Sequence, residues 1–332
     1  MRRSGGLDSE ASAGSAGRQA VDPEGSRGPT VLALVLNWNG ADDTLACLQS
    51  LKTQSWPGLQ ALVLDNGSSD DSVRRIQAAF PEVEIESLGS NLGYAGGQNA
   101  GLRAALGRGA VFALVLNNDT VLEAECVERL VDAAMRHPEA AALAPKSLLS
   151  DPPGTVYFAG GGWDPSGYPR MIGFGRPDGP EYSRERETDW LNGCALLVRC
   201  EALERIGLFD ERFFLTFEDT DWSLRARAAG HRLRLVPEAR LVHHASRSFG
   251  SSRTPTHLYY YTRNHLLFVS IHARGLARIR GFWGVFTRAR RALKRARKQS
   301  PEGGRRARRA LLRATRDFWL GWLGPERTDE SG

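Results

Sequence analysis

The 332-residue chain has no long apolar run and only four cysteines, and both features limit the classes of protein to which it can belong. No apolar stretch approaches the roughly 20 residues that cross a bilayer, so we expect no transmembrane span. The first 28 residues consist largely of Gly, Ser, Ala and Arg without the apolar core of a signal peptide, which predicts a disordered leader. The cysteines lie in apolar stretches without metal-ligand spacing, so we expect buried free thiols in a reducing cytoplasm at Cys47, Cys126, Cys194 and Cys200.

Two nucleotide-binding signatures are also missing. The first predicted strand is followed by NWNGADD rather than by the GxGxxG of dinucleotide-binding domains. No GxxxxGK[ST] of a P-loop occurs anywhere in the chain. A Rossmann dinucleotide enzyme and a P-loop NTPase are therefore both poor interpretations.

Negative charge is nearly absent from the C-terminal part of the chain. Between His272 and Gly324, sixteen Lys and Arg residues stand against two acids, Glu302 and Asp317, which gives +14. Since the whole chain has a formal net charge of +6, the remainder carries −8. A mildly acidic body joined to a strongly basic tail indicates two parts with different tasks.

Unbroken apolar segments alternate with helical patterns through the first half of the chain. The apolar segments are rich in Val, Leu and Ala and end in polar residues, which is typical of strands buried on both faces of a sheet. They cover residues 31–37, 59–65, 83–89 and 111–117, and helices are predicted at 42–51, 70–80, 96–106 and 123–137. This alternation predicts an α/β fold with a mostly parallel sheet, whose ligands bind beyond the carboxyl ends of the strands.

Polar groups and glycines gather where these strands end. Asp65, in DNGSSDDS, could accept the imide N–H of uracil or thymine, although such a stretch is more often only a strand–turn–helix joint. Gly93 and Gly96, in NLGYAGGQNAGL, would let backbone approach a ligand or let a helix pack closely on the sheet. Asp119, in LNNDT, could hold a divalent cation bound mainly by a diphosphate and water, with turn formation as the alternative. Clusters at three consecutive strand ends favour a nucleotide pocket.

Several motifs, in order and at consistent spacing, resemble glycosyltransferase family 2 over about Val31 to Leu267. They are NWNG, VLDNGSSDDS, NLGYAGGQNAGL, LNNDT, NGCALLVRCEALERIGLFDERFF, FEDTDWSLRARAAGHRL and VHHASRS. The resemblance implies a GT-A fold and an enzyme that inverts the anomeric centre of a nucleotide-activated sugar. The later YYYTRNHLL resembles the rhamnosyltransferases of bacterial cell-surface polysaccharides. That branch implies a dTDP- or UDP-sugar donor, rhamnose first, and a glycan or lipid-linked acceptor.

The resemblance also implies a metal site. LNNDT corresponds to the DxD element of the family, so Asp119 would bind Mg²⁺ or Mn²⁺. His243 is the expected companion and is preferred over His244, since adjacent residues of a strand point to opposite faces. Asn117 and Asn118 replace the additional acids of the full motif, which leaves fewer anionic ligands.

Asp219 stands at the family's position for the general base, and Glu218 is the second candidate. Asp219 is also predicted to cap a helix whose dipole keeps it ionised at neutral pH, although capping alone explains an Asp at such a position. By the same resemblance, the expected nucleotide-sugar-binding residues are Asn37, Asn39, Asp65, Gly67, Asn91, Gly93, Gly96, Asn99, Asn117, Asn118 and Asp119. The expected acceptor- or phosphate-binding residues are Gly193, Asp221, Arg263 and Asn264.

Two further regions have predicted roles. Residues 159–189 are rich in Gly, Pro and charge, which predicts a long irregular loop that covers the acceptor or is disordered. The basic tail interleaves Arg with large aromatics on both sides of a predicted linker, Ser300 to Gly304. Interfacial helices on a membrane surface fit this pattern, and a nucleic-acid-binding arm or a helical hairpin packed on the body are the alternatives.

The predicted organisation is a leader at 1–28, a GT-A domain at 29–271 and a basic amphipathic helical tail at 272–332. The chain would be a cytoplasmic glycosyltransferase, held peripherally at the inner face of the cell membrane, with no nucleic-acid partner. A nucleotidyltransferase shares this sheet type but needs a triphosphate-binding loop near the first strand, which NWNGADD does not supply. A nucleic-acid-binding protein that uses the tail is the non-enzymatic alternative.

Overall fold

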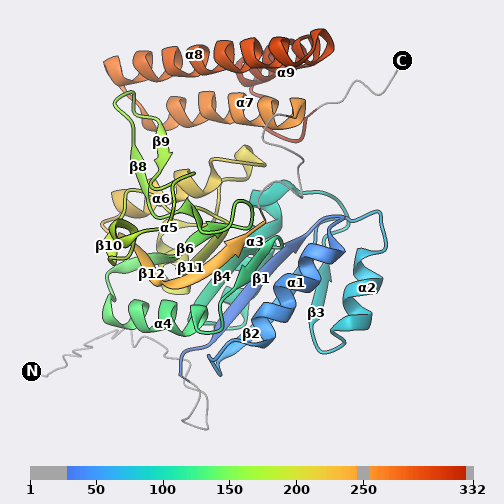
Figure 1. Ribbon diagram of the computed structural model, residues 1–332, viewed down its shortest axis with the longest axis vertical. Helices are drawn as coiled ribbons and strands as arrows, with labels where there is room; N and C mark the ends of the chain where they lie inside the picture. Colours follow the sequence, from blue (N-terminus) through green and yellow to red (C-terminus); the bar gives the residue numbers. More distant parts are fainter. Residues whose placement is uncertain (1–27, 245–253, 327–332) are drawn as a thin grey trace, which may run out of the picture.

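The first half of the chain alternates strand and helix, as its apolar pattern predicts. The computed structural model describes residues 28–244 and 254–326 (Figure 1). Its first elements are β1 (Val31–Asn37), α1 (Ala41–Lys52), β2 (Leu59–Asp65), α2 (Ser72–Ala79), β3 (Glu84–Ser87), α3 (Gly93–Gly107) and β4 (Phe112–Asn117). Strand β1 pairs in parallel with β2 and β4, and β2 pairs in parallel with β3. The predicted parallel α/β unit is therefore confirmed, and the predicted leader falls outside the described residues apart from Gly28.

The second half of the chain extends the same sheet with strands of both directions. It contains β5 (Thr120–Leu122), α4 (Cys126–Arg136), β6 (Ala140–Leu149), β7 (Thr155–Phe158), β10 (Arg186–Glu187), β11 (Ala195–Arg199), α5 (Cys200–Ile206), η2 (Glu211–Phe213), α6 (Glu218–Ala228) and β12 (Arg232–His243). The sheet order is β10, β12, β6, β11, β4, β1, β2, β3, with β5 paired to β12 and β7 to β6. Strand β11 runs antiparallel between β4 and β6, so the sheet is mixed beyond the parallel unit.

The prediction of an irregular loop at residues 159–189 is wrong. This segment contains a hairpin of β8 (Gly161–Trp163) and β9 (Pro169–Met171), the short 3₁₀ helix η1 (Pro180–Tyr182), and the edge strand β10. Side chains order the hairpin, because the Asp164 carboxylate accepts hydrogen bonds from the Ser166 and Tyr168 N–H groups. Glycine and proline here shape tight turns instead of a disordered lid.

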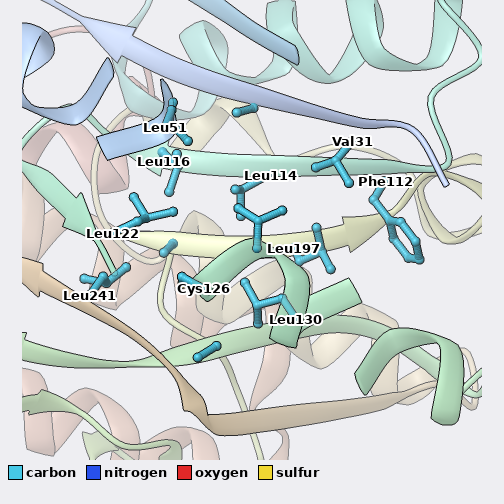
Figure 2. Packing of buried hydrophobic residues seen from close by; sticks show 14 of the residues in the cluster. Val31, Leu51, Phe112, Leu114, Leu116, Leu122, Cys126, Leu130, Leu197 and Leu241 are labelled. Carbon is cyan, nitrogen blue, oxygen red and sulfur yellow. The ribbon is translucent and has the colours of Figure 1, made fainter. Parts of the chain in front are cut away.

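The sheet is buried on both faces by apolar side chains. Figure 2 shows one of the two main clusters, in which Leu114 and Leu116 of β4 pack with Leu197 of β11 and Leu130 of α4. A second cluster lies on the opposite face under α3 and α6 and includes Trp222. All four cysteines are buried and free, as predicted. This rigid sheet fixes the positions at which the polar strand ends project.

Three helices form a layer on the remaining side of the molecule. They are α7 (Pro255–His272), α8 (Gly275–Gln299) and α9 (Pro301–Trp319), and Figure 1 shows α7 between α8 and the rest of the fold. The predicted linker at 300–304 is shorter than expected, because Ser300 already caps α9 through its hydroxyl and Pro301 begins the helix. In the part of the chain that the structure describes, no helix has the length and apolar character to cross a membrane.

Candidate functional site

A hydrogen-bonded network joins the ends of β1 and β2. The Asn37 side-chain amide donates to Asp65 Oδ1 at 3.0 Å and to Ser68 Oγ at 3.1 Å. Asp65 Oδ2 also accepts from the Ser68 N–H at 3.2 Å. The Asp65 carboxylate is 4% exposed and keeps unused lone pairs on both oxygens. It is therefore fixed in place and can still accept an N–H group from a bound base.

Asn39 holds the following turn rather than pointing freely into the site. Its φ is 50°, and its side-chain oxygen accepts from the Ser69 and Asp70 N–H groups. Gly67 has a φ of 75°, and a Cβ there would lie 2.7 Å from Ser90 backbone. These contacts give Asn39 and Gly67 a part in shaping the loops after β1 and β2, in addition to the nucleotide-sugar binding expected of them.

The loop before α3 closes against the same strand ends. Asn91 accepts from the Gly93 N–H and from the Asn66 side-chain amide. Gly93 has a φ of 75°, and a Cβ there would lie 2.4 Å from the Phe214 carbonyl oxygen. Gly96 would place a Cβ 2.9 Å from Leu92 Cβ. Gly93 thus allows the close approach of the loop at Phe214, and Gly96 makes room for Leu92 at the start of α3.

Asp119 and His243 meet at the end of the sheet. Asp119 lies in the turn between β4 and β5, and His243 ends β12, which pairs with β5. His243 Nε2 lies 3.0 Å from Asp119 Oδ1, and both residues are about 5% exposed or less. Asn118 is turned away from this pair, since its amide binds Thr44 Oγ1 at 3.0 Å. Asn117 uses its backbone N–H to bind the Cys194 carbonyl at 3.0 Å.

The Asp119–His243 pair fits a divalent cation that takes most of its ligands from elsewhere. For ligand distances of about 2.1 Å, two adjacent ligands of an octahedral ion lie about 3 Å apart, as these two atoms do. His243 Nδ1 is buried without a hydrogen-bond partner among the described residues, so no second hydrogen bond fixes the ring in this orientation. Within residues 28–244 and 254–326, no three His, Cys, Asp or Glu side chains gather to hold a metal ion by themselves. A diphosphate would have to complete the coordination.

Asp219 is connected to the end of β4 through Gly193 and Cys194, but its surroundings differ from the prediction. Helix α6 has Phe217 at its N-cap, and Asp219 is the second helical residue. Its carboxylate accepts from the Gly193 N–H at 2.8 Å and from the Thr220 N–H at 2.6 Å. The predicted capping role is therefore wrong, and Asp219 is instead tied to Gly193, next to the Cys194 carbonyl that β4 uses.

Burial acts on the Asp219 carboxyl in the opposite direction to the helix dipole that is expected to keep it ionised. Burial raises the pKa of Asp219, and its hydrogen bonds to Gly193 and Thr220 counter only part of that effect. Burial and the neighbouring Asp219 charge raise the pKa of Glu218 well above its ordinary range. Glu218 Oε2 has no hydrogen-bond partner in the described part of the chain. Of the Asp219 and Glu218 carboxyls, that of Asp219 ionises more readily, so it is the better candidate to accept a proton.

Four predicted ligand-binding residues have structural partners instead. Asn99 exchanges hydrogen bonds with the Phe209 backbone, donating to its carbonyl and accepting from its N–H. Asp221 is 1% exposed and binds Arg225 at 2.8 Å and His272 at 2.7 Å. Arg263 and Asn264 are fully buried on α7 and donate to backbone carbonyls. Asn99 is therefore held by the protein rather than free for the nucleotide-sugar, and Asp221, Arg263 and Asn264 are not available to an acceptor.

Two aromatic residues belong to the site although they were not predicted. Tyr94 donates its hydroxyl to the Gly193 carbonyl at 2.5 Å, so it helps to fix the residue whose N–H binds Asp219. Tyr157 packs edge-on against His243 with ring centroids 4.4 Å apart. Tyr94 stands inside the NLGYAGG motif and could have been found there. Tyr157 lies in the segment between β6 and β8, where no motif pointed to it.

Comparisons with known proteins point to one family of enzymes. The family described as "Glycosyl transferase family 2" matches residues 33–150. An N-acetylglucosaminyl-diphospho-decaprenol L-rhamnosyltransferase of Mycobacterium tuberculosis is 34% identical over 61% of this chain and 72% of its own length. A dTDP-rhamnosyl transferase RfbF of Shigella flexneri is 24% identical over 64% of this chain and 68% of its own length.

Solved structures show the same fold. The crystal structure of GalNAc-T7 with UDP, GalNAc and Mn²⁺ aligns with a TM-score of 0.57 at 15% identity. The alignment covers 73% of this chain and 50% of that chain. Identity at this level speaks for the fold alone, and it supports the GT-A architecture predicted from the motifs.

Proposed function

The chain belongs to glycosyl transferase family 2, and from that premise we propose that it transfers a rhamnosyl group from dTDP-rhamnose to a lipid-linked glycan acceptor. A UDP-sugar is the second donor class. The observation that carries the proposal is the convergence at one sheet end of Asp65, the Asp119–His243 pair and Asp219. Support for the sugar and the acceptor comes from the names of the relatives, one a dTDP-rhamnosyl transferase and one that acts on a diphospho-decaprenol.

The proposed reaction is a single displacement with inversion. Asp219 accepts the proton of the acceptor hydroxyl while that oxygen forms a bond to C1 of the sugar. The bond between C1 and the diphosphate oxygen breaks, and its electron pair stays on the departing nucleotide. Because burial raises the pKa of Asp219, its carboxylate is a stronger base than an exposed aspartate. Asp65 would hold the base of the nucleotide through its imide N–H.

A divalent cation, Mg²⁺ or Mn²⁺, is proposed at Asp119 and His243. When bound, the ion stabilises the negative charge that develops on the departing diphosphate. Donor affinity measured by calorimetry should fall on addition of a chelator and recover with Mn²⁺. The Asp119→Ala variant should bind donor weakly with or without the ion. Equal affinity of the unaltered protein with and without chelator would rule out the metal role.

The transfer itself can be tested with the purified full-length protein. A panel of dTDP- and UDP-sugars is first screened for thermal stabilisation with Mn²⁺, because a ligand that binds only the folded state raises the unfolding temperature. The stabilising donor is then incubated with decaprenyl-diphospho-N-acetylglucosamine, and the product is analysed by mass spectrometry. dTDP-rhamnose should stabilise most strongly and add one deoxyhexose. The proposal would be refuted if none of these donors stabilised the protein and none was transferred to the acceptor.

We also propose that residues 29–271 form the catalytic domain and that the tail, 272–332, rests on the cytoplasmic membrane surface. The outer face of α8 supports this, since it is apolar in its first half and basic in its second. Leu276, Ile279 and Trp283 are each 66–71% exposed at helical spacing. The same face continues into exposed cations at Arg290, Arg291, Lys294 and Lys298. Each basic residue near an anionic leaflet contributes about 1 kcal/mol, so a few of them suffice for salt-sensitive attachment.

Flotation with anionic vesicles tests the membrane proposal. The full chain should float and be released in part by high salt, because surface charge is screened. Replacing Ile279 and Trp283 by serine should weaken flotation several-fold. Met135→Ser, which alters an apolar side chain 58% exposed on α4, is the matched control and should float normally. A protein that ignores the vesicles but binds DNA or RNA tightly at physiological salt would favour the nucleic-acid alternative.

A further inference from the structure

The loop that leads into α6 has an unusual backbone. Phe214, Thr216 and Phe217 have φ values of 59°, 70° and 74°. Residues other than glycine rarely adopt this left-handed region, and bulky or β-branched side chains are the least suited to it. Three such residues within four positions persist only where the surroundings hold them. Since the loop ends at Glu218 and Asp219, whatever holds it also sets the position of the proposed base.

Asn264 and Arg263 hold this loop from α7. The Asn264 side-chain amide donates to the carbonyls of Phe213 and Leu215, both at 2.5 Å, and to that of Thr216 at 3.1 Å. Arg263 Nη2 donates to the carbonyls of Arg212 and Phe213 at 3.1 and 3.0 Å. The Arg263 Nε–H donates to Asn264 Oδ1 at 2.9 Å, which fixes the orientation of the amide. Both side chains are 0% exposed.

The opposite side of the loop is held by α3. The Phe214 carbonyl accepts from the Tyr94 N–H at 2.6 Å and from the Ala95 N–H at 3.2 Å. Tyr94 also donates its hydroxyl to Gly193, whose N–H binds Asp219. A shift of the loop would therefore move Asp219 relative to Gly193 and disturb both ends of this chain of contacts.

We propose that Arg263 and Asn264 are positioning residues that hold the 213–217 loop in its left-handed conformation and thereby place the Asp219 carboxylate for proton transfer. The role rests on the proposed function of Asp219 as the base. It replaces the acceptor-binding role expected from the sequence, because every Arg263 and Asn264 contact described above goes to the protein itself. Arg263 Nη1 also donates to the Gly324 carbonyl, so the segment after α9 closes over the same guanidinium.

The test compares Arg263→Lys and Asn264→Ser with a control on the same helix. Lysine keeps the charge but loses the planar fork that reaches several carbonyls. Ser270→Ala is the matched control, because it removes a side-chain hydrogen bond of α7 to the Leu267 carbonyl (2.7 Å) and leaves the loop contacts intact. Each variant is assayed for kcat with the stabilising donor and the decaprenyl acceptor. Donor affinity is measured by calorimetry, and the binding stoichiometry gives the fraction of molecules that are folded.

Both loop variants should lose kcat about 10- to 100-fold per folded molecule while donor affinity changes less than twofold, since a misplacement of about 1 Å can cost about 10²-fold. Ser270→Ala should keep kcat within about twofold. Adding Arg263→Lys to Asp219→Asn should cause no further loss, because the positioned group is already gone. If one of Arg263→Lys and Asn264→Ser does not fold, the same comparison is made with the other.

Two results would overturn the inference. One is kcat within twofold of the unaltered enzyme in a folded loop variant. The other is a full additional loss when Arg263→Lys is combined with Asp219→Asn, which would mean that the pair acts on something other than the base. Failure of the proposed function is a different result, namely near-full kcat in Asp219→Asn alone.

Discussion

Replacing Asp219 with asparagine removes the proposed base while keeping the size and shape of the side chain. If Asp219 accepts the acceptor proton, kcat should fall about 10²–10⁴-fold, the usual contribution of general-base catalysis. Donor affinity should change little, because the residues expected to bind the nucleotide lie at the ends of β1, β2 and β4. The loss should therefore appear in kcat rather than in the donor KM.

The structure also gives the expected cost in stability. The Asp219 carboxylate accepts from Gly193 on one oxygen and from the Thr220 N–H and hydroxyl on the other. An asparagine can keep the Thr220 contacts through its oxygen, but its NH₂ group would then face the Gly193 N–H. Leaving that buried donor unsatisfied costs about 1–3 kcal/mol. Even from a starting stability of about 5 kcal/mol, such a loss leaves fewer than about one molecule in twenty unfolded.

The expected loss of kcat is much larger than the loss that unfolding could cause, so the assay distinguishes a catalytic role of Asp219 from a structural one. Unfolding on that scale lowers kcat by only a few per cent, so a drop of 10² or more must come from chemistry. The assay is rhamnosyl transfer at saturating donor, with urea unfolding measured on the same preparation. An Asp219→Asn enzyme that is folded and keeps kcat within threefold would refute the assignment and leave Asp219 a structural partner of Gly193. Loss of activity in proportion to loss of folded protein would refute it as well.

Two further predictions concern stability. Because burial raises the pKa of Glu218, the stability that its protonated form provides is complete below its ordinary pKa and is lost as the pH rises through the raised value. Glu218→Gln cannot ionise, so its unfolding temperature should exceed that of the unaltered protein by a margin that grows from about pH 5 to pH 8; a constant margin would contradict this. Gly93→Ala should lower the free energy of unfolding by about 1–3 kcal/mol because of the φ of 75°. The clash of the new Cβ with the Phe214 carbonyl should lower it further. Gly89→Ala is the control, since Gly89 has a φ of 76° with nothing within 4 Å of a Cβ, and equal losses in urea unfolding would show that the Phe214 contact is unimportant.

Local pattern was sufficient to predict the parallel half of the fold. Unbroken Val and Leu segments between amphipathic helices have few alternatives, and β1, β2 and β4 lie where they were expected. The antiparallel strands were not predicted, because the direction of a strand such as β11 depends on its partners across the sheet and not on its own residues. The hairpin of β8 and β9 was missed for a related reason: its short strands are only three residues each, and glycine and proline dominate their composition.

The site was predicted in part, and the errors have a common cause. Residues at strand ends, such as Asp65 and Asp119, lie together as parallel topology requires. Polar residues on helices were assigned to ligands because the sequence cannot show what they face. Asn99 and Asn264 look like free amides in the sequence, yet each binds backbone from a segment far along the chain. Burial depends on tertiary contacts, and those contacts determine whether a polar side chain binds a ligand or holds a loop.

The same contacts explain why the donor and acceptor sides of the site are built differently. The donor side uses the ends of sheet strands, whose positions are fixed by the apolar core and need little further support. The base stands in the first turn of α6, directly after a loop that the sheet does not fix, so its geometry depends on α3 on one side and α7 on the other. Helix α7 in turn packs against α9, where Tyr259 binds Asp317, and α9 packs against the exposed helix α8. The tail is therefore joined to the proposed base through a short series of buried contacts, so shortening the chain after α7 should impair kcat even with an acceptor that needs no membrane. A chain ending at Ala273 that folds and keeps full kcat on such an acceptor would show that the tail serves only for attachment.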